Sequence, residues 1–230
     1  MGDVPHLRLG LLGGTLDPVH RGHVAAAQAA RQALALDRVW LMPTHVPGHR
    51  SRPAASGWHR FAMAAMAVED DPHLAVSDLE LAREGPTYTW DTLEALASQG
   101  YRPSQLFFIT GADAFGAIES WHRYPALLDR AHFVVVSRPG HPLAFAHDGP
   151  PAVRERVRRV SGGESPAHDQ QPAVWVVEAD TPDVSSTDIR ARVAAGAAID
   201  DLVTPRVDAH IRRHALYDAA SPARTLHGES

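Results

Sequence analysis

The chain has 230 residues, of which 44% are hydrophobic and 21% charged, a balance typical of a globular domain that buries a sizeable core. No apolar run approaches the roughly 20 residues of a membrane-spanning helix, and the absence of cysteine excludes disulfides and cysteine-bound metals. The net charge of −5 argues against nucleic acid as the main partner. These numbers fit a cytoplasmic protein with no membrane or nucleic-acid partner, and they leave the oligomeric state open, a homo-oligomer included.

All 22 basic residues are arginines, because the sequence contains no lysine. A phosphate loop of the Walker A type, a Schiff base and a lysyl-nucleotide intermediate are therefore excluded. Any phosphate clamp must use arginine, histidine, backbone N–H groups or a metal. Arginine suits this task because its planar guanidinium grips phosphate oxygens in pairs.

Apolar, strand-like runs alternate with helix-prone segments along the chain. The strand-like runs cover residues 7–12, 39–42, 106–110, 133–136 and 174–177. The helix-prone segments cover residues 24–36, 58–68, 89–98, 112–128 and 153–160. This alternation predicts an α/β fold with a doubly wound parallel sheet and helices on both faces. Ligands in such sheets bind beyond the carboxyl ends of the strands, where the motifs below are expected.

The first motif, GGTLDPVHRGH at residues 13–23, joins the first strand to the first helix. Gly13, Gly14 and Thr15 form a turn that lets the backbone approach a phosphate closely, and the helix adds its free N–H groups. His20 and His23 lie three residues apart at the helix start, hence on one face. They are candidate donors to a phosphate. Two alternatives are a pair of metal ligands and two ordinary surface histidines among the fifteen of the chain.

Residues 43–56 carry three prolines, two histidines and two arginines and predict a mobile basic loop. His45, His49, Arg50 and Arg52 are candidate phosphate ligands there. A solvated loop is equally consistent with this spacing.

The segment GPTYTWDTL at residues 85–93 predicts the start of a helix, with Thr87 or Thr89 as its cap. In a functional interpretation, Thr87, Tyr88 and Thr89 offer hydroxyl and N–H groups to the carboxylate or amide of a small ligand. Most runs of this kind are only helix starts.

Gly111 and Asp113 follow the third strand-like run. The glycine permits close backbone approach, and the carboxylate is a candidate ligand for a ribose or an amino group. Downstream, Trp121 is a candidate for stacking on a flat ring. The alternative is a core tryptophan, but the polar neighbours Glu119 and His122 favour partial exposure.

The segment SSTDIR at residues 185–190 precedes a helix-prone stretch. Its serines and threonine fit an ordinary helix cap. Together with Arg190 one turn later, Ser185, Ser186 and Thr187 also form a second candidate anion site. The region 139–171 predicts a surface excursion, and the segment after Tyr217 predicts a disordered tail.

Taken together, these motifs resemble the bacterial nicotinate mononucleotide adenylyltransferases of the HxGH nucleotidyltransferase superfamily, which has a Rossmann-like sheet. The resemblance runs from about residue 7 to about residue 217. It differs from the family pattern at Leu16, where the family has Phe, and in the basic loop, which reads PGHR rather than PPHK or PPHR. A further family segment, Ser-Arg-Pro-Gly, matches residues 137–140 and includes Arg138.

The resemblance implies transfer of AMP from ATP to nicotinate mononucleotide, giving nicotinate adenine dinucleotide and pyrophosphate, with Mg²⁺ bound to the ATP. It implies one nucleotidyltransferase domain over residues 1–218, a tail over 219–230, and catalytic roles for His20, His23 and Arg190. The residues implied for ATP are Gly13, Gly14, Thr15, His20, His23, Gly111, Asp113, Ser185, Ser186, Thr187 and Arg190. Those implied for nicotinate mononucleotide are His45, His49, Arg50, Thr87, Tyr88, Thr89, Trp121 and Arg138.

Three alternatives stay open at this point. One is a nucleotidyltransferase of the same superfamily that acts on another mononucleotide or phosphorylated substrate. Another is a non-catalytic nucleotide sensor, and the third is a metal-dependent hydrolase that uses His20 and His23. No dedicated protein metal site is expected in the first case, because Mg²⁺ keeps several waters and is held largely by the phosphates.

Overall fold

The computed structural model describes residues 7–47, 53–83, 85–137, 143–160 and 171–218. The chain divides into two compact units. The first unit consists of Met1–Gly13, Ala26–Trp40 and Tyr88–Thr181, and the second of Gly14–Ala25, Leu41–Thr87 and Pro182–Ser230. Among the described residues, no helix has the length and apolar character needed to cross a bilayer.

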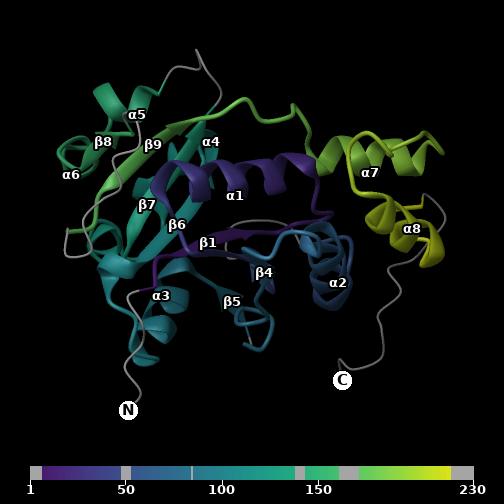
Figure 1. The fold of residues 1–230 in the computed structure, drawn as a ribbon, viewed down its shortest axis with the longest axis horizontal. Coiled ribbons are helices and arrows are strands. Elements are labelled where there is room, and N and C mark those ends of the chain that lie inside the picture. Colours follow the sequence, from purple (N-terminus) through teal and green to yellow (C-terminus); the bar gives the residue numbers. More distant parts are fainter. Residues whose placement is uncertain (1–6, 48–52, 84, 138–142, 161–170, 219–230) are drawn as a thin grey trace. The chain divides into compact units, whose positions relative to one another are not determined.

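A seven-stranded sheet has the order β4-β2-β1-β6-β7-β9-β8 (Figure 1). Its strands are β1 (Leu9–Gly14), β2 (Arg38–Pro43), β4 (Leu74–Val76), β6 (Leu106–Gly111), β7 (His132–Ser137), β8 (Val157–Arg159) and β9 (Val174–Glu178). The chain moves outward from β1 to β2 and β4 on one side, and from β6 through β7 to β9 on the other. Crossover connections between parallel strands are right-handed as a rule, and chain reversal at the sheet centre then places helices on both faces. The predicted doubly wound sheet is confirmed.

Parallel pairing joins β1 to β6, β6 to β7, and β9 to both β7 and β8. The strands β6 and β7 are buried along almost their whole length, as expected for continuous apolar runs covered on both faces. A separate parallel pair joins β3 (Val46–Pro47) to β5 (Pro86–Thr87).

In the described part of the chain, five helices are longer than two turns: α1 (Arg21–Leu34), α2 (Gly57–Val68), α3 (Thr89–Ser98), α7 (Ser186–Ala194) and α8 (Pro205–Arg213). Shorter pieces are α4 (Ala112–Phe115), α5 (Ala144–His147), α6 (Pro151–Arg154) and the 3₁₀ turns Pro103–Gln105, Ile118–Ser120 and Ala126–Asp129. Helix α1 buries Ala27, Ala30 and Leu34 on one face, at the spacing of an amphipathic helix.

Two predicted helices are wrong. The segment 112–128 breaks into α4 and two 3₁₀ turns. Between the two turns, Arg123 takes a positive φ of 61°, which is incompatible with a continuous right-handed helix. The segment 153–160 contains α6 and then the edge strand β8, which pairs with β9. Pairing with a neighbouring strand is a tertiary interaction that overrides the local helix preference of an arginine-rich stretch.

The core of the first unit contains a fully buried histidine at the start of β7. His132 Nδ1 accepts hydrogen bonds from the backbone N–H of Ala173 and from Trp175 Nε1, both at 3.1 Å. Its ring stacks on Phe107 with centroids 4.6 Å apart. Burial, with the nearby Arg8 charge as a second cause, lowers the pKa of His132 from 6.5 to about 4. The ring is therefore neutral in the folded protein at physiological pH.

This buried ring predicts a loss of stability in acid. Between pH 6.5 and 4, His132 takes up a proton in the unfolded state and not in the folded state, so the free energy of unfolding falls as the pH falls. The full loss for one such group is about 3 kcal/mol. Urea unfolding at pH 7, 5.5 and 4.5 measures it. His132→Asn keeps a hydrogen-bond acceptor and cannot titrate, so its free energy of unfolding should depend less on pH. His147→Ala, at an exposed position, is the control and should follow the wild type. Equal slopes of unfolding free energy against pH in all three proteins would refute this origin.

Candidate active site

The glycine turn of the second unit is held by a buried carboxylate. Asp17, 3% exposed, accepts hydrogen bonds from the backbone N–H groups of Ala54 at 2.7 Å and Ala55 at 3.1 Å. The Tyr217 hydroxyl donates to the same carboxylate at 2.7 Å. Leu16, next to it, is buried and has a positive φ of 50°, a conformation that non-glycine residues rarely adopt. The turn is thus fixed by contacts from outside the motif.

Two histidines stack where this turn meets α1. The ring centroids of His20 and His23 are 3.7 Å apart with an interplanar angle of 29°. The backbone N–H of His20 donates to His23 Nδ1 at 3.2 Å, so the proton of a neutral His23 ring lies on Nε2. His20 Nδ1 is buried and has no hydrogen-bond partner among the described residues. One ring nitrogen of the pair therefore has no hydrogen-bond partner among the described residues.

Burial keeps both rings uncharged. It lowers the pKa of His20 from 6.5 to about 4. The pKa of His23 is also lowered well below 6.5, first by desolvation and then by the neighbouring His20. At neutral pH the two imidazoles therefore act as hydrogen-bond dipoles and not as cations.

Gly22 makes room for this stack. A Cβ at this position would lie 3.1 Å from His20 Nδ1 and 3.3 Å from the carbonyl oxygen of Pro182. Both distances are shorter than ordinary van der Waals contact. The glycine between the two histidines is therefore explained by packing.

The Ser-Ser-Thr segment forms the start of α7 and binds the glycine turn directly. Ser185 is the N-cap, whose Oγ accepts from the N–H of Asp188 at 3.0 Å. The Ser186 hydroxyl donates to the Pro18 carbonyl at 2.8 Å, and Arg190 Nη1 donates to the Asp17 carbonyl at 2.7 Å. The structure therefore brings the two predicted phosphate motifs together, with Arg190 against the turn that leads to the histidine pair.

In this arrangement Ser186 uses its one hydroxyl proton on Pro18. Toward a phosphate, α7 then offers the backbone N–H groups of its first turn and the remaining N–H groups of Arg190. Arg190 Nη2 also contacts Thr187 Oγ1 at 3.3 Å, which keeps the guanidinium along the first turn of the helix.

A buried arginine on α2 joins the glycine turn to two points of the loop at residues 43–56, and the sequence analysis missed it. Arg60, 1% exposed, donates to the backbone carbonyls of Thr15 at 2.7 Å, His45 at 3.2 Å and Ala55 at 3.2 Å. Desolvation lowers the pKa of Arg60, while the nearby Asp17 raises it. The signal that could have indicated this buried residue is that Arg60 is the one arginine inside the apolar stretch 57–68.

The first unit contains another group of the predicted residues. Gly111 ends β6, and a Cβ there would meet nothing within 4 Å, so the space beyond this strand is open. Asp113 is exposed in the short helix α4 that follows. This agrees with the predicted position of both residues at the carboxyl end of a strand.

The turn after residue 120 is held by aromatic contacts. Trp121 is half-buried and meets Phe108 and Phe133 edge-on, with centroids 5.8 and 6.3 Å away. His122 lies over Tyr88, with centroids 4.7 Å apart. Partial exposure of Trp121, predicted from its polar neighbours, is confirmed.

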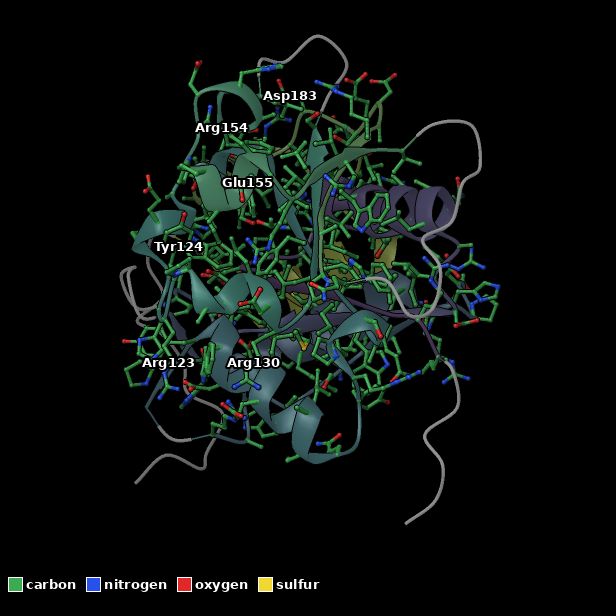
Figure 2. The ribbon with its side chains drawn as sticks, turned by 90° about the vertical axis from the view of Figure 1, so that its left-hand side faces the viewer. Arg123, Tyr124, Arg130, Arg154, Glu155 and Asp183 are labelled. Atoms are coloured by element: carbon green, nitrogen blue, oxygen red, sulfur yellow. The ribbon has the colours of Figure 1, made fainter. Side chains whose placement is uncertain are left out.

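The same turn is fixed to α3 by arginines. Arg123 and Arg130, both labelled in Figure 2, have their guanidinium carbons 4.7 and 4.4 Å from the ring centroid of the buried Trp90. Such cation–π contacts hold a surface turn against a helix.

The predicted residues thus fall into groups. The second unit holds Gly14, Thr15, His20, His23, His45, Thr87, Ser185, Ser186, Thr187 and Arg190. The first unit holds Gly13, Tyr88, Thr89, Gly111, Asp113 and Trp121. His49, Arg50, Arg52 and Arg138, and the predicted tail 219–230, lie outside the described residues. Among the described residues, no three His, Asp or Glu side chains are arranged to hold a metal ion.

A cytidylyltransferase-like family model matches residues 11–192, which include both phosphate motifs. The chain is 38% identical over 210 residues to the probable nicotinate-nucleotide adenylyltransferase of Cronobacter sakazakii, covering 90% of this chain and 94% of that protein. It is 32% identical to that of Shewanella frigidimarina, covering 92% of this chain and all of that protein. The fold is similar to that of the Plasmodium falciparum nicotinic acid mononucleotide adenylyltransferase complexed with NaAD, with a TM-score of 0.70, 17% identity, and coverage of 92% and 98%.

This chain therefore belongs to the cytidylyltransferase-like nucleotidyltransferases and, within them, to the nicotinate-nucleotide adenylyltransferase family. The resemblance inferred from the sequence motifs is confirmed, and so is the Rossmann-like fold that it implied.

Proposed function

We propose that the chain transfers AMP from ATP to nicotinate mononucleotide, giving nicotinate adenine dinucleotide and pyrophosphate. One observation supports this most strongly: the neutral, stacked His20–His23 pair adjoins the helix start that carries Arg190, through the Asp17 and Pro18 carbonyls. This arrangement offers directed N–H donors to a row of phosphates. The names of the relatives support the choice of acceptor, and the absence of cysteine fits the cytoplasmic location that we propose.

In the proposed reaction, an oxygen of the mononucleotide phosphate attacks the α-phosphorus of ATP in line. A bond forms between that oxygen and the α-phosphorus, and the bond to the bridging oxygen of the β-phosphate breaks. Pyrophosphate leaves with the electron pair. The attacking phosphate is already ionised at neutral pH, so no side-chain nucleophile is needed, and positioning with charge stabilisation accounts for the catalysis.

The residues of the second unit have distinct roles in this proposal. The Nε2–H of His23, and His20 beside it, donate hydrogen bonds to the oxygens of the reacting phosphoryl group, where negative charge grows in the transition state. Arg190 and the first turn of α7 hold the β- and γ-phosphates. Being neutral, the imidazoles do not lose a proton to the phosphate, and their donors are already oriented by the stack.

Gly111 and Asp113 are proposed to bind the ATP ribose. The proposed ligands of the mononucleotide are His45, His49, Arg50, Thr87, Tyr88, Thr89, Trp121 and Arg138. Mg²⁺ enters with ATP as part of the substrate and screens the phosphate charge. The phosphate-binding groups described here are nitrogen donors, which suits a metal held by phosphates and water and not by a protein cage.

Pyrophosphate release tests the proposed reaction. We expect turnover with ATP and nicotinate mononucleotide, and slower turnover when nicotinamide mononucleotide replaces it. CTP in place of ATP, and phosphopantetheine as acceptor, serve as controls for the superfamily alternative. Pyrophosphate release with phosphopantetheine and not with a pyridine mononucleotide would show that the acceptor is wrong, and release with CTP and not with ATP would show that the nucleotide donor is wrong.

Replacing Trp121 by alanine should raise the KM for nicotinate mononucleotide and leave the KM for ATP nearly unchanged. A planar stack lost from a binding site costs on the order of 1–3 kcal/mol, by analogy with bases stacked on aromatic residues. This corresponds to roughly a 5- to 150-fold rise in KM. Steady-state kinetics with each substrate varied in turn measures both constants.

The exposed tryptophan of the second unit, Trp58, provides the matched control: Trp58→Ala should leave both KM values unchanged. If Trp121 only fills the edge of the core against Phe108 and Phe133, Trp121→Ala instead lowers the melting temperature and leaves both KM values alone. A stable variant with unaltered affinity for the mononucleotide would contradict the stacking role.

A further inference from the structure

The last described segment of the chain packs back onto the second unit. Helix α8 buries Val207 and Ile211 and lies against α2. Beyond the helix, Ala215 and Tyr217 both have positive φ values, 48° and 68°, so the backbone turns sharply there. Leu216, between them, is buried. This anchored turn directs the side chain of Tyr217 to a defined place.

That place is the carboxylate at the centre of the glycine turn. Tyr217 Oη donates to Asp17 Oδ1 at 2.7 Å, across 200 positions of sequence. Burial raises the pKa of Tyr217 well above 10, with the Asp17 charge as a second cause, so the phenol keeps its proton and remains a donor. The Asp17 carboxylate has three described donors: the two loop N–H groups of Ala54 and Ala55, and this hydroxyl.

Asp17 in turn supports the proposed reaction centre through its backbone. Its carbonyl oxygen accepts from Arg190 Nη1 at 2.7 Å. The next residues of the turn lead to His20 within three positions, and the Pro18 carbonyl accepts from Ser186. A shift of Asp17 therefore moves both the histidine pair and the start of α7, which hold neighbouring phosphates in the proposed function.

We propose that Tyr217 is a positioning residue for adenylyl transfer: its hydroxyl fixes Asp17, and through the Asp17 backbone it sets the distance between the histidine pair and Arg190. This rests on the proposed function, because it assigns those two groups to one row of phosphates. Tyr217 touches no reacting atom. It acts because a misplacement of about 1 Å in a phosphate-binding centre is enough to cost about 100-fold in rate.

Tyr217→Phe removes the hydroxyl alone and is the central variant. We expect kcat to fall by about 10- to 100-fold, and the dissociation constant of ATP to rise at least about 5-fold, in protein that a thermal melt shows to be fully folded at the assay temperature. The KM for nicotinate mononucleotide should change less than about 3-fold, since within the described part of the chain the hydrogen-bond donors to the Asp17 carboxylate are not among its proposed ligands. Tyr101→Phe, a tyrosine of the first unit, is the matched control and should behave as the wild type.

Asp17→Asn and the double variant complete the test. If the hydroxyl acts through Asp17, adding Tyr217→Phe to Asp17→Asn causes little further loss, so the two effects are strongly non-additive. Additive losses, a kcat within 2-fold of the wild type, or a loss that only follows the folded fraction would each overturn the proposal.

The result of this test does not depend on which acceptor substrate the enzyme uses. The comparison is the ratio of variant to wild type with whichever mononucleotide the wild type uses, and ATP binding is measured without any acceptor. Failure of the proposed function appears as lack of turnover in the wild type and in Tyr101→Phe alike. Failure of the positioning role appears as wild-type ATP affinity in Tyr217→Phe.

Discussion

Replacing His23 by alanine is expected to lower kcat about 100- to 1000-fold, the usual cost of losing one preorganised donor to a developing negative charge. The neutral His23 ring directs Nε2–H away from its Nδ1 contact with the His20 backbone, so the variant loses that donor in the transition state. Steady-state turnover with saturating ATP and nicotinate mononucleotide measures the loss, beside a thermal melt.

Two further variants separate catalysis from folding. His23→Asn keeps an acceptor for the His20 N–H and lacks Nε2, so it should be as inactive as alanine while melting closer to the wild type. His147→Ala, at an exposed position of the first unit, should leave turnover unchanged. Turnover of His23→Asn within a few-fold of the wild type would rule out the donor role.

Replacing Arg190 by alanine should weaken ATP and pyrophosphate far more than nicotinate mononucleotide. A lost charge-assisted hydrogen bond is worth about 1.5–3 kcal/mol, which corresponds to roughly 10- to 150-fold in affinity. The guanidinium sits at the start of α7, where the β- and γ-phosphates are proposed to bind. Isothermal titration with ATP and with the mononucleotide, each alone, measures the two changes.

Arg192 gives the matched control on the same helix. It pairs with Asp188 at 3.1 Å and is partly exposed, so Arg192→Ala removes an arginine from α7 without touching the glycine turn. We expect no change in ATP affinity. Equal weakening of both substrates by Arg190→Ala would count against the assignment of this residue to the leaving pyrophosphate.

The central strands were predictable because their burial on both faces leaves a clear pattern in the amino-acid sequence. Runs such as residues 106–109 and 133–136 are apolar without interruption, which is typical of a strand covered on both faces. The helix α8 was missed although Pro205 stands at its first position, a known start signal. Its sequence is mostly polar, and only Val207 and Ile211 reach the core, so the apolar pattern is weak.

At the candidate site, too, prediction from the sequence succeeded only where a local pattern exists. The glycine turn and the Ser-Ser-Thr segment each have a local signature, so their residue types and helix starts were predictable. Their contact was not, because it depends on the carbonyls of Asp17 and Pro18, groups that every residue carries. Arg60 and Tyr217 act on the turn from 43 and 200 positions away from Asp17, and no spacing rule indicates such partners.

The uncharged state of the stacked histidines has a consequence for ionic strength. Dissolved ions screen attraction between net charges over about 10 Å at 0.1 M salt, but hardly affect a hydrogen bond made at contact. Added salt should therefore weaken the part of ATP binding that Arg190 supplies and leave the contribution of the two imidazoles in place. The slope of ATP affinity against salt concentration would then become shallower in Arg190→Ala and stay as in the wild type in His23→Asn.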